Sequence, residues 1–235
     1  MSRTLLLFDI DGTLVDTGGA GLKVLHETAA ELFGGELSFE GIDTAGRLDP
    51  SLFAEAARNS GFDFGPDDEA RLRDAYIANL AEALTQPEGR LRALPGTLAL
   101  MQQLGKLIAE RNGDAPVLGC LTGNYGGAAR VKLEATGFDP SQFTITAFGD
   151  EAPTRPGLTA LAIQRYETQY GHPVDPQRVI VIGDTPHDVD CAKAHGCVAF
   201  AVATGRFGLQ ELIAAGADIA VADLCDAFPL IDLVV

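Results

Sequence analysis

The feature that most constrains the fold of this chain is a repeated alternation of short apolar runs with longer helical stretches. Five apolar runs are expected to form strands, at residues 4–8, 117–121, 178–182, 198–202 and 219–221. A weaker sixth strand is expected at 144–148. Helices are expected at 97–111, 126–136, 157–170, 188–195 and 208–215. The runs are almost continuously apolar, as in strands buried on both faces of a parallel sheet. Because helices separate the strands, the pattern predicts an α/β fold with a doubly wound parallel sheet.

One long stretch departs from this alternation. Residues 17–92 contain no convincing strand, and helices are expected there at 22–33, 50–59 and 67–84. Glycine and proline lie at its limits, where they favour turns between units. We therefore expect an α/β core of residues 1–16 and 93–235, with a smaller helical cap of residues 17–92 inserted after the first strand.

The charge balance limits the possible partners. Lys and Arg total 17 against 33 Asp and Glu, a formal net charge of −16, so nucleic acid and anionic membranes are not expected partners. No apolar run approaches the roughly 18 residues that span a bilayer. The apolar run at the N-terminus is too short for a signal peptide. We expect a cytoplasmic protein, either a monomer or a homodimer.

The most informative motif is Asp9-Ile10-Asp11-Gly12-Thr13, directly after the first apolar run. Ligands of open α/β sheets bind at the carboxyl ends of the strands. A turn at Gly12 would bring both carboxylates to one reacting atom, where one can act as a nucleophile and the other as a general acid and base. Two such carboxylates do not easily stay ionised together without a cation. Since all the ligands are oxygens, Mg²⁺ is the expected cofactor.

A second motif, Thr122-Gly123-Asn124, follows the run at 117–121. A hydroxyl followed by glycine at a strand end, close to a helix start, can donate hydrogen bonds to phosphate oxygens. Taken alone this signal is weak, because Thr-Gly turns are common.

A third motif contains Gly183-Asp184 and Asp188 after the run at 178–182, and its two carboxylates could complete a metal site. The alternative for Asp188 is that it only starts a helix, and both roles are compatible. Arg155 precedes Pro156-Gly157 near another expected helix start, where it could bind a phosphate or neutralise the carboxylates. The alternative for Arg155 is a surface charge.

In this order and at these strand ends, the motifs resemble the haloacid dehalogenase superfamily, whose members are mostly phosphohydrolases. The resemblance covers the whole chain, and the cap is similar to that of phosphoglycolate phosphatase and β-phosphoglucomutase. It implies that Asp9 is the nucleophile that becomes an aspartyl-phosphate and that Asp11 is the acid and base. It also implies that Asp184 binds Mg²⁺ together with Asp9 and the Asp11 carbonyl, with support from Asp188.

The resemblance further implies that Thr122, with Gly123, binds the phosphate. The family places a basic residue, more often lysine, where Arg155 stands. The other basic residues between the second and third motifs fall in expected helices or at a strand start, so Arg155 is the best fit; they are Arg130, Lys132, Arg165 and Arg178.

The expected function is a Mg²⁺-dependent phosphatase that hydrolyses a small organic phosphate monoester. A phosphosugar mutase similar to β-phosphoglucomutase is the alternative, because such enzymes share all these motifs. A 2-haloacid dehalogenase fits less well, since a halide leaving group needs no proton and Asp11 would have no role. Arg47 in the cap, Asn124 and His187 are candidate contacts to a small phosphorylated metabolite.

Overall fold

A parallel sheet forms the centre of the molecule. The computed structural model describes residues 3–34, 37–85, 91–111 and 113–234. The strands of the sheet are β1 (Leu5–Phe8), β4 (Val117–Leu121), β5 (Ile145–Ala147), β6 (Val179–Gly183), β7 (Val198–Val202) and β8 (Ile219–Val221). They lie in the order β5-β4-β1-β6-β7-β8, and every pair is parallel. The predicted doubly wound α/β fold is confirmed, and the weak sixth strand is the edge strand β5.

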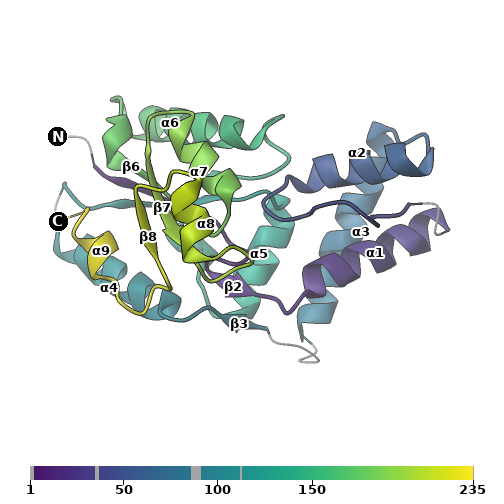
Figure 1. The fold of residues 1–235 in the computed structure, drawn as a ribbon, viewed down its shortest axis with the longest axis horizontal. Helices are drawn as coiled ribbons and strands as arrows, with labels where there is room; N and C mark the ends of the chain where they lie inside the picture. Colours follow the sequence, from purple (N-terminus) through teal and green to yellow (C-terminus); the bar gives the residue numbers. More distant parts are fainter. Residues whose placement is uncertain (1–2, 35–36, 86–90, 112, 235) are drawn as a thin grey trace.

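Helices cover both faces of this sheet (Figure 1). On one face lie α4 (Thr97–Glu110), α5 (Gly126–Ala135) and the short α9 (Phe228–Ile231). On the other lie α6 (Arg155–Tyr170), α7 (Pro186–Lys193) and α8 (Leu209–Ala214). The side chains of β1 alternate between the two cores, with Leu6 and Phe8 in the first and Leu5 and Leu7 in the second. All four are fully buried, as expected for a central strand.

Three helices form the cap beside this core: α1 (Ala20–Phe33), α2 (Asp49–Ser60) and α3 (Pro66–Thr85) (Figure 1). Their apolar faces make a third hydrophobic cluster, which also includes Tyr125 and Ala128 from the core. The ring of Phe53 stacks on Tyr125 with centroids 5.7 Å apart. The cap is therefore packed against the core at the start of α5.

Several local features differ from the predictions. Two-residue strands β2 (Val15–Asp16) and β3 (Arg92–Ala93) pair antiparallel where the chain leaves the core and returns to it. Elements this short have no periodicity, so they were not predicted. Helix α9 and two 3-10 turns, Pro140–Gln142 and Pro176–Arg178, were not predicted either. In the part of the chain that the structure describes, no helix is long and apolar enough to cross a membrane.

The structure places the start of α6 at Arg155, slightly earlier than the predicted start at residue 157. The helix begins at Arg155, because the Thr154 hydroxyl accepts a hydrogen bond from Gly157 N and Pro156 occupies the first turn. Similarly, α7 begins at Pro186 rather than at Asp188. In both cases the helix starts at or just before the proline.

Candidate active site

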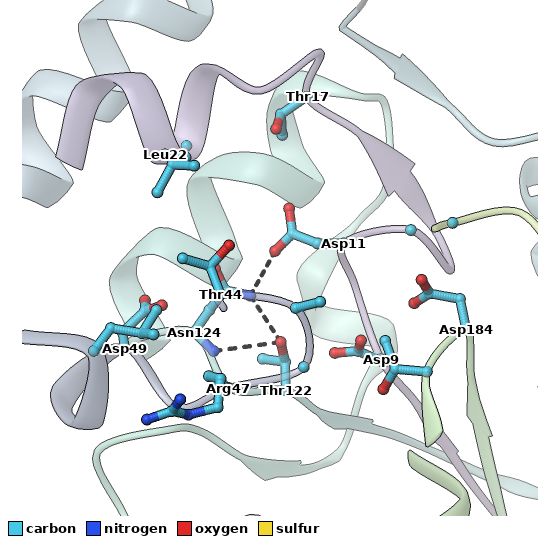
Figure 2. A pocket seen from close by; sticks show the side chains of 18 of the residues that line it. Asp9, Asp11, Thr17, Leu22, Thr44, Arg47, Asp49, Thr122, Asn124 and Asp184 are labelled. Atoms are coloured by element: carbon cyan, nitrogen blue, oxygen red, sulfur yellow. Dashed lines mark hydrogen bonds between the residues drawn. The ribbon is translucent and has the colours of Figure 1, made fainter. Parts of the chain in front are cut away.

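The candidate site lies where the three central strands end. Asp9, Thr122 and Asp184 directly follow β1, β4 and β6, which are neighbours in the sheet. Together with residues of the cap they line a cavity of about 300 Å³ (Figure 2). The structure thus brings together the three strand ends that the sequence analysis singled out.

An acidic cluster occupies the core side of this cavity. Asp9, Asp184 and Asp188 are buried, and each offers a carboxylate oxygen within 4.8 Å of the others. Arg155 Nη2 lies 3.2 Å from Asp9 Oδ2 and also donates to Asp188 Oδ1. One guanidinium therefore pairs with two of the three buried carboxylates.

The excess of negative over positive charge in the cluster is reflected in the pKa values of its carboxyl groups. Burial raises the pKa of Asp9 to about 7, against the opposing effect of Arg155, and the negative charges of Asp188 and Asp11 add to the rise. Burial also raises the pKa of Asp184 well above its usual range, with further contributions from Asp188 and Asp9. Additional positive charge would stabilise the ionised cluster.

The surroundings of Asp184 fit a small, hard cation. Thr13 Oγ1 donates to Asp184 Oδ1 at 3.1 Å. A Cβ atom at Gly12 or at Gly205 would overlap the Asp184 carboxylate. Glycine at both positions therefore leaves the space that this carboxylate occupies. The donors of the cluster are all oxygens, which suits Mg²⁺. The Asp11 carboxylate is not a member of the cluster, so only its carbonyl remains a candidate ligand.

Asp188 caps the start of α7, one of the roles that the sequence left open, and it also binds Arg155. Its Oδ2 accepts hydrogen bonds from the backbone N and, at 2.7 Å, the hydroxyl of Thr185, which completes a capping box at the start of α7. Its Oδ1 accepts from Arg155. Both oxygens are thus engaged by the protein, and Asp188 holds Arg155 beside Asp9.

Two core residues beside the cluster offer hydrogen-bond donors to the cavity. Thr122 Oγ1 accepts a hydrogen bond from Asn124 Nδ2 at 2.8 Å, which leaves the Thr122 hydroxyl proton available as a donor. Arg155 Nε is buried and has no hydrogen-bond partner among the described residues. A buried, unsatisfied donor beside a polar cavity is consistent with an anionic ligand.

Gly123, a predicted phosphate contact, also joins the core to the cap. Its carbonyl accepts a hydrogen bond from Asp49 N at 2.8 Å. A Cβ atom at Gly123 would overlap the carbonyl oxygen of Arg47, so only glycine permits this close approach of the cap. Both features place the cap segment directly over the end of β4.

The three candidate substrate contacts have different positions. Arg47 lines the cavity, where its Nη2 lies 2.6 Å from Glu55 Oε2, and Asn124 lines it from the core. His187 is exposed and is not among the residues that line the cavity. It lies against Gly46, since a Cβ atom there would be 2.9 Å from His187 Cδ2. His187 thus lies beside the cap turn at Gly46, and its contact with a substrate stays a prediction.

Lys132 is the site residue that sequence reasoning missed. The sequence favours Arg155 as the basic residue of the site because Lys132 falls in an expected helix. In the structure, however, Lys132 lines the cavity and its Nζ lies 2.6 Å from Asp11 Oδ2. A long side chain can reach a strand end from the second turn of α5. One signal was present: Lys132 shares the buried face of that helix with Ala128, Ala129 and Leu133.

A doubly wound sheet with an acidic site at its carboxyl edge and a helical cap defines a class of α/β hydrolytic enzymes. The sequence model of the haloacid dehalogenase-like hydrolases matches residues 6–193. The chain belongs to this family, as its motifs predicted.

Known relatives agree with this assignment. A phosphoglycolate phosphatase of Mesorhizobium japonicum is 27% identical over 208 residues, which cover 87% of this chain and 85% of the relative. CbbY of Rhodobacter sphaeroides, solved in complex with phosphate, has a TM-score of 0.71 at 20% identity, with 96% of each chain covered. The β-phosphoglucomutase of Clostridium difficile has a TM-score of 0.69 at 16% identity, covering 99% of this chain and 97% of the other. At these identities the two structures show similarity of fold.

Proposed function

We propose that this protein is a Mg²⁺-dependent phosphatase that hydrolyses a small organic phosphate monoester. The observation that carries the proposal is the position of Asp9, which lies in a buried acidic cluster with Arg155 at 3.2 Å and faces the cavity. Membership of a hydrolase family and the phosphoglycolate phosphatase relative support a phosphoric monoester hydrolase.

In the proposed reaction, an Asp9 carboxylate oxygen attacks phosphorus and the bond from phosphorus to the ester oxygen breaks. Asp11 gives its proton to the departing oxygen, and Asp9 becomes an aspartyl-phosphate. Asp11 then takes a proton from a water molecule that attacks phosphorus, which releases inorganic phosphate and restores Asp9. Thr122 and Arg155 hold the phosphoryl oxygens. Asp9, Asp184 and the Asp11 carbonyl would hold Mg²⁺, which would supply positive charge to offset that of the phosphoryl group.

The cap supplies the rest of the substrate pocket. We assign residues 17–92 to the cap and residues 1–16 and 93–235 to the core. A cavity of about 300 Å³ suits a leaving group no larger than a small metabolite. Its cap side combines apolar Leu22 and Leu25 with the charged Arg47, so a short carbon chain with a second polar group is the expected substrate type.

Substitution of Asp9 tests the central step. Asp9→Asn should lower turnover at least about 1,000-fold, because an amide does not attack phosphorus. The assay is phosphate release from a panel of phosphorylated metabolites with saturating Mg²⁺. Asp190→Asn, an exposed carboxylate on α7, is the matched control and should retain full activity.

Two outcomes would change the proposal. Substantial turnover by Asp9→Asn would remove Asp9 from the nucleophilic role. Conversion of a sugar phosphate to its isomer, with little free phosphate, would indicate the mutase alternative.

A further inference from the structure

Lys132 is a charged side chain in an unusual position. Only 5% of it is exposed, and it projects from α5 into the space between core and cap. Its ammonium donates to Asp11 Oδ2 at 2.6 Å and to Asn124 Oδ1. Burying an ammonium is costly unless it is paired, and here its partner is the carboxylate that the proposed reaction uses twice.

Asn124 completes a hydrogen-bonded network around this carboxylate. Lysine only donates hydrogen bonds, so the Asn124 atom that it contacts must be the oxygen, and this fixes the orientation of the amide. Asn124 Nδ2 then donates to Asp11 Oδ2 at 2.7 Å and to Thr122 Oγ1 at 2.8 Å. Figure 2 shows the Asp11 carboxylate between Asn124 and Thr17.

The two oxygens of Asp11 therefore differ. Oδ2 accepts hydrogen bonds from Lys132 and Asn124, whereas none of the described residues donates to Oδ1. Two donors on one oxygen restrict the rotation of the carboxylate. The side chain of Asp11 is 41% exposed, so a substrate or a water molecule can reach Oδ1 from the cavity.

The cap closes over the ammonium. A Cβ atom at Gly21 of α1 would lie 3.4 Å from Lys132 Nζ and 3.6 Å from the hydroxyl of Tyr76, a buried residue of α3. Gly21 and Tyr76 thus lie close to the ammonium, and the low exposure of the Lys132 side chain strengthens its interaction with Asp11.

We propose that Lys132 is a positioning residue, which together with Asn124 holds Asp11 Oδ2 so that Oδ1 faces the leaving-group oxygen and then the attacking water. The inference rests on the proposed function, in which Asp11 transfers both protons. It explains why a cation is buried on a helix face that is otherwise apolar.

Lys132→Met tests the proposal, because methionine has nearly the same length and no charge. With p-nitrophenyl phosphate, kcat should fall roughly 10- to 100-fold, while KM changes less than about threefold, since Lys132 does not hold the phosphoryl group. Arg130→Met removes an exposed charge from the same helix and should behave as wild type. Should Lys132→Met not fold, Lys132→Gln replaces it and should lower kcat at least about threefold.

A double substitution separates positioning from a structural role. If Lys132 acts through Asp11, adding Lys132→Met to Asp11→Asn should change kcat less than about twofold beyond Asp11→Asn alone. The proposal is overturned if the losses in kcat from the two substitutions multiply in the double variant. It is also overturned if a Lys132 variant has wild-type kcat. A crystal structure of Lys132→Met gives a readout independent of activity: an unchanged Asp11 carboxylate would also overturn it. A wild-type protein that releases no phosphate would instead refute the proposed function.

Discussion

At the scale of single residues, Arg155 offsets part of the negative charge of the buried acidic cluster. It lies within ion-pair distance of both Asp9 and Asp188. Burial lowers the pKa of its guanidinium, but Asp188 and Asp9 outweigh this effect and the pKa is raised. The guanidinium therefore stays charged beside Asp9 and Asp188.

Arg155→Ala should lower kcat/KM about 100-fold or more, because it leaves the carboxylates and the phosphoryl group without their cation. Arg155→Lys should retain much of the rate, within about tenfold, since it keeps the charge but loses the planar fork. Steady-state kinetics on the best substrate measures both effects. An alanine variant as active as wild type would place the basic role elsewhere.

Gly205 is a second residue on which the geometry of the site depends. Because an added Cβ would overlap the Asp184 carboxylate, Gly205→Ala should displace this carboxylate and lower kcat/KM about 100-fold at fixed Mg²⁺. Gly105→Ala is the control, since Gly105 lies within α4 with open space around it. Equal activities of the two variants would show that the loop after β7 moves aside without affecting Asp184.

At the scale of elements, the first turn of α2 connects the cap to the end of β4. Asp49 N donates to Gly123 O, and Asp49 Oδ2 accepts from Tyr125 N at 3.0 Å. Burial raises the pKa of Asp49 to about 6, against the lowering effect of Lys132. The cap is therefore held to the core by a carboxyl group that titrates in a mildly acidic range.

The raised pKa predicts how this contact responds to pH. The folded protein binds the Asp49 proton more tightly than the unfolded chain, so this contribution to stability is complete below pH 3.8 and is lost as pH rises through about 6. Asparagine keeps an oxygen for Tyr125 N and does not titrate. Relative to wild type, Asp49→Asn should therefore gain on the order of 1 kcal/mol of unfolding free energy between pH 4 and pH 7. Urea denaturation at both pH values measures this, and parallel pH profiles would contradict it.

At the scale of the whole molecule, the acidic cluster lies at the carboxyl ends of the two central strands, β1 and β6, and in the first turn of α7. A cation bound there stabilises the folded state by mass action, by about 2.7 kcal/mol at a concentration 100 times its Kd. For a chain of this size, each kcal/mol corresponds to a rise in Tm of about 2–4 °C.

Mg²⁺ should therefore raise the Tm of the metal-free protein by several degrees, and exhaustive chelation should eliminate phosphatase activity. Thermal denaturation with and without Mg²⁺, together with phosphate-release assays, tests both effects. In Asp184→Asn the Mg²⁺-dependent rise in Tm should largely disappear. Full turnover after chelation would exclude the metal from the reaction.

The sequence alone was enough to predict the strands of the central sheet. The predicted limits of β4, β7 and β8 agree with the structure residue for residue, because strands buried on both faces appear as local apolar runs. The same runs predicted which polar residues follow the strands, and neighbouring parallel strands place those residues at one edge of the sheet. Asp9, Thr122 and Asp184 could therefore be grouped before any contact was known, while their catalytic roles remain predictions.

Only the tertiary structure decided the contacts made by long side chains and close backbone approaches. Lys132 meets Asp11 across 121 residues of sequence, and Gly205 approaches Asp184 from a loop with no recognisable motif. His187 lies between Asp184 and Asp188 in sequence, yet it is exposed beside the cap turn at Gly46 and does not line the cavity. These contacts depend on how helices and loops pack in three dimensions, and local periodicity contains no information about that packing.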